Sequence, residues 1–256
     1  MFRKQFHISL DTADTYCKSL TLIMKTPIKY TLALASAFAL SQLAHAASWT
    51  AGHGDLGIGY EDGALEPHWH LGEDNESVTL DGTSGPLGPE GAEYEADEIT
   101  PVTSLTQSID GSLFYVFPAT ENATVPFIGF GTEELSVDDW NGSLTLSLTG
   151  ASGPGSFSLF STDSLGVVST LMDSSDGFST VDSITLAPET HTHHTWAFSQ
   201  TGSYDLTFQV TGDHVSAGAQ SASATYGFSV VPEPSTAGLL LGAAALVLTV
   251  VRRRVA

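Results

Sequence analysis

Imidazole side chains, which bind divalent transition metals, are concentrated at two places in this sequence. Three of the nine histidines fall in the segment 191–194, HTHH, and two more flank a tryptophan in the segment 68–70, HWH. Alternate residues of a β-strand point to the same face, and their Cα atoms lie about 6.6–6.8 Å apart, so the two imidazoles of an H-x-H pair can converge on one ion. Both segments are therefore candidate halves of a metal site.

Strand alternation places both histidine pairs away from the expected core. In an extended segment 195–198, Trp196 and Phe198 share one face, and the next run, 204–210, has Tyr, Leu, Phe and Val at alternate positions. Because those faces are apolar, His191 and His193 are expected on the opposite face or at its rim. Trp69 is separated from its two neighbours in the same way. We predict one metal site assembled from distant parts of the chain, with these candidate ligands: His191, His193, His68, His70 and His53.

Neutral imidazole suits zinc, copper, nickel and iron, so the residues alone indicate a divalent transition metal. The only cysteine, Cys17, lies before all of the candidate histidines, in the segment 1–23, so ligation is by nitrogen and oxygen alone. Zinc takes four protein ligands in a closed site, or three and a water in an open one, so five candidates exceed the need. Imidazole binds metal only when deprotonated, and affinity should fall below about pH 6.5. The carboxylates nearest in sequence are Asp55, Glu66, Glu73, Asp74 and Glu189.

Not every histidine is expected to bind metal. His214 follows a Gly-Asp pair and is interpreted as a solvated loop residue, and His194 occupies a spacer position beside the H-x-H pair. A single H-x-H pair on an acidic surface is often incidental, which leaves a structural interpretation open.

All basic side chains lie near the two ends of the chain. The 256 residues include 8 Lys or Arg against 29 Asp or Glu, which gives a formal net charge of −21. No Lys or Arg occurs between Tyr30 and Val251. Such a surface repels nucleic acid and anionic lipid headgroups and concentrates cations near it. A nucleic-acid function is therefore excluded.

Residues 24–46 have the features of an export signal. A basic segment, MKTPIK, is followed by an apolar stretch at 30–43 and by Ala44-His45-Ala46. Signal peptidase recognises small residues at such positions. Cleavage is therefore predicted after Ala46, so that the mature chain begins at Ala47. Residues 1–23 are unpatterned, and we interpret them as a mis-assigned extension with the true start at Met24. A long signal peptide that begins at Met1 is the alternative.

The C-terminal segment 231–256 combines three features. Pro232-Glu233-Pro234 precedes sixteen uncharged residues, 236–251, and then three arginines. Sixteen helical residues span roughly 24 Å, less than the ~30 Å hydrocarbon core, and the arginines would stay cytoplasmic. A plain transmembrane anchor is one interpretation. The order and spacing, however, resemble the PEP-CTERM sorting signal of Gram-negative bacteria. That resemblance implies transient anchoring in the inner membrane, processing by an exosortase-type protease, and delivery to the cell surface or extracellular matrix.

Residues 47–230 are predicted to form one all-β domain. Short alternating runs, such as those at 113–117, 127–130, 144–148 and 204–210, are separated by Gly, Asp, Asn and Ser. This spacing favours a single Ig-like β-sandwich, flanked by the N-terminal signal and the C-terminal transmembrane helix. Residues 81–98 contain much Gly, Pro and acid, and we predict a long surface loop there.

A family resemblance covers most of residues 47–230. The pattern His191-x-His193-x-x-Trp196-x-Phe198, followed by the GxYxL segment 202–206, resembles the signature of bacterial surface-anchored domains of the choice-of-anchor M type. The segments 52–56 and 60–70 are similar to the opening of that domain. Together with the PEP-CTERM tail, the chain resembles the Zur-repressed PEP-CTERM family found beside metal-uptake systems. The resemblance implies zinc handling outside the inner membrane, with His191 and His193 as leading ligands.

Three functions are consistent with these features. The first is a non-catalytic, zinc-binding surface protein that captures or buffers metal under zinc limitation. The second is a structural or adhesive matrix protein whose histidines are incidental. The third is a metal-dependent hydrolase, which ranks last because the sequence contains neither an H-E-x-x-H nor a G-x-S-x-G motif.

Overall fold

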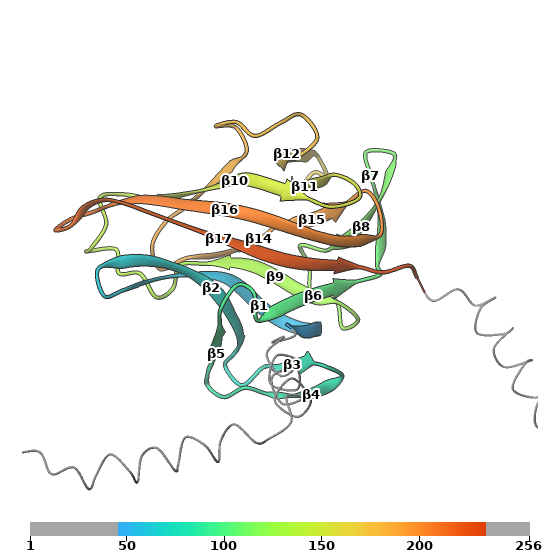
Figure 1. Ribbon diagram of the computed structural model, residues 1–256, viewed down its shortest axis with the longest axis horizontal. Coiled ribbons are helices and arrows are strands. Elements are labelled where there is room, and N and C mark those ends of the chain that lie inside the picture. The colour runs from blue at the N-terminus through green and yellow to red at the C-terminus, as the bar shows by residue number, and fades with distance from the viewer. Residues whose placement is uncertain (1–45, 234–256) are drawn as a thin grey trace, which may run out of the picture. The chain divides into compact units, whose positions relative to one another are not determined.

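The computed structural model describes residues 46–233, which form two β-sheets packed around a shared core (Figure 1). Every regular element in this part of the chain is a strand. The prediction of an all-β sandwich is therefore confirmed. The predicted signal segment and the apolar anchor segment lie outside the described residues. Within residues 46–233 there is no helix long and apolar enough to cross a membrane.

The larger sheet has twelve strands, eight of them in the order β13-β10-β16-β17-β6-β1-β2-β5. The remaining four attach beside β1: β9 pairs with β1 and β14 with β9, while β3 pairs with β1 and β4 with β3. Most neighbours are antiparallel, but β1 runs parallel to both β6 and β9. The bounds are β1 (Ala47–Glu61), β2 (Ala64–Glu73), β3 (Ser77–Leu80), β4 (Thr83–Pro86), β5 (Glu90–Tyr94), β6 (Ile99–Thr103), β9 (Pro126–Gly131), β10 (Leu144–Ser152), β13 (Ser183–Leu186), β14 (His191–His193), β16 (Gly202–His214) and β17 (Gly218–Val230).

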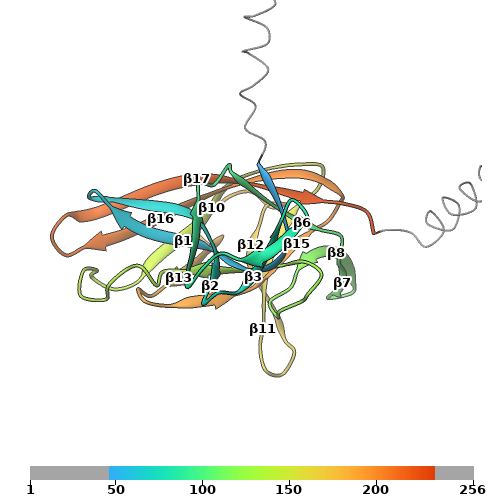
Figure 2. The same ribbon diagram turned by 90° about the horizontal axis from the view of Figure 1, so that it is seen from below.

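The smaller sheet has five strands in the order β12-β11-β15-β8-β7. Its bounds are β7 (Thr106–Ile109), β8 (Ser112–Phe117), β11 (Phe157–Thr162), β12 (Val168–Asp173) and β15 (Thr195–Phe198). Among the described residues the β16–β17 hairpin is the longest, and it crosses the middle of the view in Figure 1 and lies near the upper edge in Figure 2.

The segment 191–198 passes from one sheet to the other. β14 pairs with β9 in the larger sheet, whereas β15 pairs with β11 and β8 in the smaller sheet. His194 is the single residue between them. Because the chain changes sheets at His194, strand alternation counted back from Trp196 and Phe198 does not set the faces of His191 and His193. The crossing fixes His191 and His193 on the larger sheet.

The core is aromatic, and the predicted core residues lie in it. Trp69, Trp196, Phe198, Tyr204 and Phe208 are all at most 2% exposed. Trp196 packs between the sheets, with ring centroids 4.9 Å from Phe130 and 5.8 Å from Phe208. Trp69 and Trp196 therefore face inward, as strand alternation predicted.

Two local predictions are wrong. The predicted loop 81–98 contains β4 and β5, because β5 pairs with the otherwise open edge of β2 and completes its hydrogen bonding. His214 is not a solvated loop residue, since it is 9% exposed at the end of β16 and stacks on Tyr60 with centroids 4.5 Å apart. Its Nδ1 accepts hydrogen bonds from the N–H groups of Ser216 and Ala217. His214 is a structural residue.

The loop before β13 is held by one buried carboxylate. Asp182 accepts hydrogen bonds from the N–H of Asp173 at 2.9 Å and from the N–H and hydroxyl of Ser179 at 2.8 and 3.1 Å. Burial alone would raise the pKa of Asp182, but these hydrogen bonds outweigh it and the pKa lies below its usual value of 3.8.

We expect Asp182→Ala to lower the free energy of unfolding by about 2–4 kcal/mol at neutral pH, since it removes hydrogen bonds to a charged group and leaves buried N–H donors unpaired. Because the folded-state pKa is depressed, the stabilisation is fully present above pH 3.8 and is lost as pH falls through the lower folded value. The difference from the parent should therefore shrink in acid. Urea unfolding at several pH values measures it, with exposed Asp176→Ala as the control; equal stabilities at neutral pH would contradict it.

Candidate metal centre

One face of the larger sheet carries histidines and carboxylates whose side chains lie directly above glycines of β1 and β9. Along β1 the residues on this face are His53, Asp55, Gly57 and Gly59, whereas the alternate positions hold buried Leu56 and Ile58. The neighbouring strands present Gly129 and Gly131 from β9, His191 and His193 from β14, and His68 and His70 from β2. Glycine leaves room above the sheet because it has no side chain, and the polar side chains occupy that room.

The glycines are in direct contact with the candidate ligands. A Cβ at Gly57 would lie 2.8 Å from His68 Nε2, and one at Gly59 would lie 2.8 Å from Glu134 Oε2. A Cβ at Gly129 would meet Asp55 Oδ1 and lie 2.9 Å from His193 Cε1. A glycine inside a strand marks a close approach of another group. Here the approaching groups are imidazoles and carboxylates.

His53, Asp55, His191 and His193 form the first histidine cluster. Each of the four offers one ligand atom, and these atoms all lie within 4.8 Å of one another. The Nε2 atoms of His191 and His193 are 2.6 Å apart, and Asp55 lies 3.5 Å from His53 Nε2 and 3.8 Å from His191 Nε2. On a tetrahedral zinc with bonds of 2.0–2.1 Å, two nitrogens would be about 3.3 Å apart. Small side-chain movements would bring this cluster to that geometry.

Several polar atoms of the first histidine cluster are buried without hydrogen-bond partners. They are His53 Nε2, Asp55 Oδ1 and His193 Nδ1. Buried polar atoms are nearly always paired, so three orphans in one cluster require an explanation. A cation that bound His53 Nε2 and Asp55 Oδ1 would satisfy two of them. The donor chemistry of this cluster therefore fits a metal ion.

Outer carboxylates orient two of the imidazoles. Glu76 lies 3.1 Å from Nδ1 of His53, and Glu133 lies 3.3 Å from Nδ1 of His191. In both rings Nε2 is the nitrogen that faces Asp55. Metal-bound histidines characteristically donate their other ring N–H to a carboxylate or carbonyl, which fixes the ring and its tautomer. His193 is held differently, by stacking on Phe127 with centroids 3.6 Å apart.

The pKa values of His193 and His53, both in the first histidine cluster, are shifted in opposite directions. Burial, together with the neighbouring His191 and His53, lowers the pKa of His193 to about 4, so this imidazole is neutral at physiological pH and ready to bind metal. Burial also opposes protonation of His53, but the nearby negative charges of Asp55 and Glu76 outweigh it and the pKa of His53 is raised. Metal binding to His53 therefore competes with protonation.

His68, His70 and Glu134 form the second histidine cluster, whose three ligand atoms also lie within 4.8 Å of one another. Glu134 Oε1 lies 3.1 Å from His68 Nε2 and 3.3 Å from His70 Nδ1. The structure therefore divides the five predicted ligands between two groups. His53 joins His191 and His193, and the β2 pair stands beside them with a carboxylate of its own. This corrects the prediction of one shared site.

Glu134 and the two histidines shift one another's pKa values in opposite directions. Hydrogen bonds with His68 and His70 lower the pKa of Glu134 to about 2. The hydrogen bond with Glu134 raises the pKa of His70 to about 9. Burial opposes protonation of His68, but the hydrogen bond and charge of Glu134 outweigh it and the pKa of His68 is raised. Glu134 and His70 therefore form a charge-assisted pair at neutral pH.

Sequence reasoning missed Glu133 and Glu134, which lie far from every histidine along the chain. They follow β9 in a turn closed by the N–H of Leu135 and the carbonyl of Thr132. The hydroxyl of Thr132 donates to the carbonyls of Ala187 and Thr190, which lead into β14. One buried threonine thus ties the two glutamates to the strand that carries His191. The Gly-x-Gly of 129–131 is the feature of the sequence that could have indicated this face.

Of the carboxylates named from sequence, Asp55 lies within the first histidine cluster and Glu73 lies 3.2 Å from His70. Glu189 accepts a hydrogen bond from the N–H of Val137.

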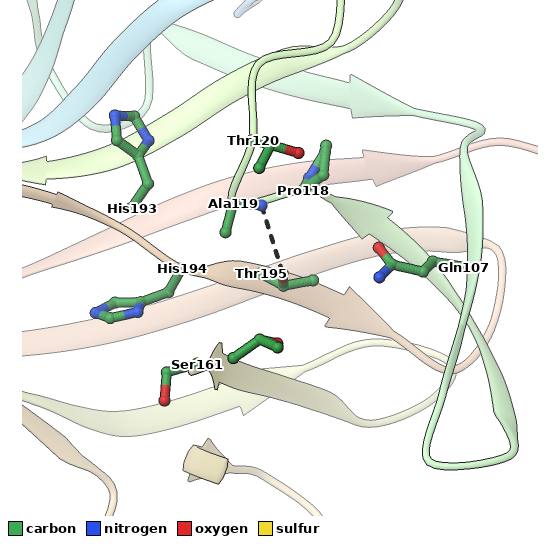
Figure 3. Close-up of a pocket in the computed structure, with 9 residues that line it drawn as sticks. Gln107, Pro118, Ala119, Thr120, Ser161, His193, His194 and Thr195 are labelled. Atoms are coloured by element: carbon green, nitrogen blue, oxygen red, sulfur yellow. Dashed lines mark hydrogen bonds between the residues drawn. The ribbon is translucent and has the colours of Figure 1, made fainter. Parts of the chain in front are cut away.

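A cavity of about 540 Å³ lies behind His193 (Figure 3). It is lined by both sheets where the chain crosses between them, and the rings of His193 and His194 point to opposite sides of that segment. The N–H of Ala119 donates to Thr195 Oγ1 across it. His194 belongs to neither histidine cluster, and burial lowers its pKa. The lining residues are Gln107, Pro118, Ala119, Thr120, Ser161, Thr162, His193, His194 and Thr195.

Comparison with known proteins bears on the C-terminal segment alone. Residues 230–254 match the family model described as the PEP-CTERM protein-sorting motif, which confirms the PEP-CTERM part of the resemblance. Neither a curated protein nor a solved structure matches the chain. The motif covers the predicted processing residues Pro232, Glu233 and Pro234. The chain thus carries the sorting signal of an exported, exosortase-processed protein of the Gram-negative cell envelope.

Proposed function

We propose that this protein is a non-catalytic, zinc-binding protein of the cell surface that captures or buffers metal when zinc is scarce. The observation that carries the proposal is the first histidine cluster, in which three imidazoles and a buried carboxylate converge. The sorting motif supports a location outside the inner membrane, where such capture would occur. The resemblance to choice-of-anchor M domains and to the Zur-repressed family agrees with zinc as the metal and with a metal-uptake system as the partner.

The donor set supports binding rather than catalysis. Four protein ligands fill the tetrahedral coordination of zinc, and catalytic zinc sites keep one position open. Three nitrogens and one oxygen suit zinc, and nickel or copper would also bind them. Residues 46–233 contain no Lys or Arg to compete for the carboxylates. The first histidine cluster is therefore proposed as a storage or capture site.

A structural or adhesive matrix protein is the second candidate function. The sandwich fold and the sorting motif would serve it equally well, and the histidines would then be incidental. The orphaned atoms His53 Nε2 and Asp55 Oδ1 favour metal binding over this alternative, since a purely structural cluster would be expected to pair them. A hydrolase ranks third, because the four ligands of the first histidine cluster would leave no metal position open for a reacting water or substrate.

Zinc titration of the purified protein by calorimetry, in high salt, tests the proposal. High salt screens the weak attraction of divalent ions to the acidic surface, so what remains is site binding. We expect tight binding by the parent and loss of the tightest event in His191→Ala/His193→Ala, since half of the ligands are removed. The double variant should keep its fold, because both side chains lie outside the hydrophobic core.

The matched control is His194→Ala, which removes the neighbouring histidine that lies outside both clusters. It should leave every zinc-binding event intact. If the double variant and the parent bind zinc equally in high salt, the first histidine cluster is not a metal site, and the matrix function becomes the better interpretation.

A further inference from the structure

We propose that His68, His70 and Glu134 form a second, separate metal site of open coordination, which takes a divalent transition ion such as zinc. The site stands on its own ligands and does not depend on whether the first histidine cluster binds metal. Its side chains are mostly buried, with 8% of His68, 14% of His70 and 31% of Glu134 exposed.

On each imidazole one ring nitrogen contacts a backbone carbonyl, and the other ring nitrogen faces Glu134. Nδ1 of His68 lies 3.0 Å from the carbonyl oxygen of Glu66, and Nε2 of His70 lies 2.8 Å from the carbonyl oxygen of Glu90. A carbonyl can only accept, so each of these nitrogens carries the proton and donates it. In the neutral rings the lone pairs are then on His68 Nε2 and His70 Nδ1, the two atoms that face Glu134.

Backbone carbonyls that fix the tautomer in this way are typical of metal-bound histidines. Two neutral lone pairs directed at a carboxylate oxygen would repel it, so the arrangement needs either extra protons or a cation at its centre. A cation satisfies all three groups at once.

Three ligands of this kind leave at least one coordination position for solvent. Two histidines and one glutamate are a donor set that zinc accepts with an open fourth position. Glu73 approaches His70 Nδ1 to 3.2 Å and is the nearest additional carboxylate. The first histidine cluster, by contrast, has four ligands. We therefore expect the second site to bind its ion more weakly and to exchange it faster.

An acidic cavity leads to this site. A cavity of about 230 Å³ reaches His68, and the only other non-acidic residue in its lining is Tyr94. Carboxylates around an entrance raise the local concentration of cations and speed their arrival. The acidic lining residues are Glu61, Glu66, Glu93, Glu95 and Glu98.

The two clusters are immediate neighbours on one sheet face. Asp55 of the first and His70 of the second are directly paired across β1 and β2, which places their Cα atoms about 4.5–5.5 Å apart. Glu133 and Glu134, adjacent in the chain, contact His191 and His70 respectively. The protein would thus hold two ions side by side, one enclosed and one exchangeable.

Zinc stoichiometry in high salt tests the proposal on the purified protein. We expect two ions per chain in the parent and one in Glu134→Gln, which keeps the size of the side chain but removes its charge. His191→Ala/His193→Ala should also retain one ion, held at the second site. Replacing zinc with cobalt then reports the coordination of each remaining ion. In His191→Ala/His193→Ala the cobalt ion should give the weak visible absorption of a site with bound water. In Glu134→Gln it should give the strong absorption of a closed tetrahedral site.

Gly59→Ala provides a second variant that leaves every ligand in place. Its Cβ would lie 2.8 Å from Glu134 Oε2. The substitution should therefore lower the affinity of the second site for its ion at least tenfold. Gly85→Ala is the matched control, since a Cβ there meets nothing within 4 Å. The proposal is overturned if Glu134→Gln and Gly59→Ala both bind as many ions as the parent with unchanged affinity. It is overturned equally if the parent binds one ion, which only the His191/His193 variant loses. That second outcome would leave the proposed function intact.

Discussion

Trp196→Ala is expected to lower the free energy of unfolding by about 3–5 kcal/mol, the range for removing a fully buried large aromatic side chain. Trp196 is 0% exposed and contacts the rings of Phe130, Phe157 and Phe228, which belong to both sheets. Its indole N–H has no hydrogen-bond partner, so the substitution orphans no polar group and the loss is one of packing alone. Chemical denaturation of the purified variant measures the change.

The matched control for this prediction is Phe178→Ala, which also truncates an aromatic residue. Phe178 is 46% exposed, so its loss should change stability by no more than about 0.5 kcal/mol. If Trp196→Ala proved as stable as Phe178→Ala, the packing of the two sheets against each other at β15 would be wrong. Because Trp196 lies three residues after His193, such a result would also remove the reason for placing His193 on the larger sheet.

Local patterns in the sequence were sufficient to predict the strands and their inward faces. Trp69 lies between two polar neighbours on its strand, and Trp196 shares alternate positions with Phe198, and both patterns are properties of a few adjacent residues. The five histidines likewise lie on or beside one sheet face. What local patterns do not contain is which strands become neighbours.

The division of the histidines into two clusters depends on such distant pairing. His53 meets His193 because β9 runs parallel to β1 and also pairs with β14. The paired residues are 74 apart in the chain between β1 and β9, and 60–64 apart between β9 and β14. Neither the parallel pairing nor the change of sheet at His194 leaves a periodic signal. A prediction that joined all the histidines in one site was therefore the simplest one available without the sheet order.

Glu134 was missed for a related reason. It lies in a turn, where no alternation assigns a side chain to a face, and its partners are contributed by β2. Its direction is set by the hydrogen bonds of Thr132 to the segment before β14. Residues 81–98 were misread because the glycines and prolines that suggested a loop are compatible with a short strand at a sheet edge, where β5 completes β2.

The glycines beneath the first histidine cluster provide a direct test of whether its side chains bind zinc. Gly129→Ala introduces a single methyl group, which would collide with Asp55 Oδ1 and lie 2.9 Å from His193 Cε1. Gly129 does not have a positive φ, so alanine adds no backbone strain there. The substitution should therefore displace two proposed ligands without removing any of them. We expect the zinc affinity of the first site to fall by about 10–100-fold, the range for disturbing groups that orient metal ligands.

Overpacking should also cost stability, by about 1–3 kcal/mol in the metal-free protein, because Asp55 and His193 are held by close neighbours. The two effects separate in a thermal unfolding series with and without zinc. Zinc raises the stability of a protein that binds it by an amount set by the ratio of free metal to Kd, and Gly129→Ala should lose most of that increase. Gly85→Ala, on β4 with no atom near its new Cβ, should retain all of it. A Gly129→Ala protein that gained as much stability from zinc as the Gly85→Ala control would show that neither Asp55 nor His193 contacts the ion. The binding site would then have to lie elsewhere on the sheet, and the second histidine cluster would be the remaining candidate for it.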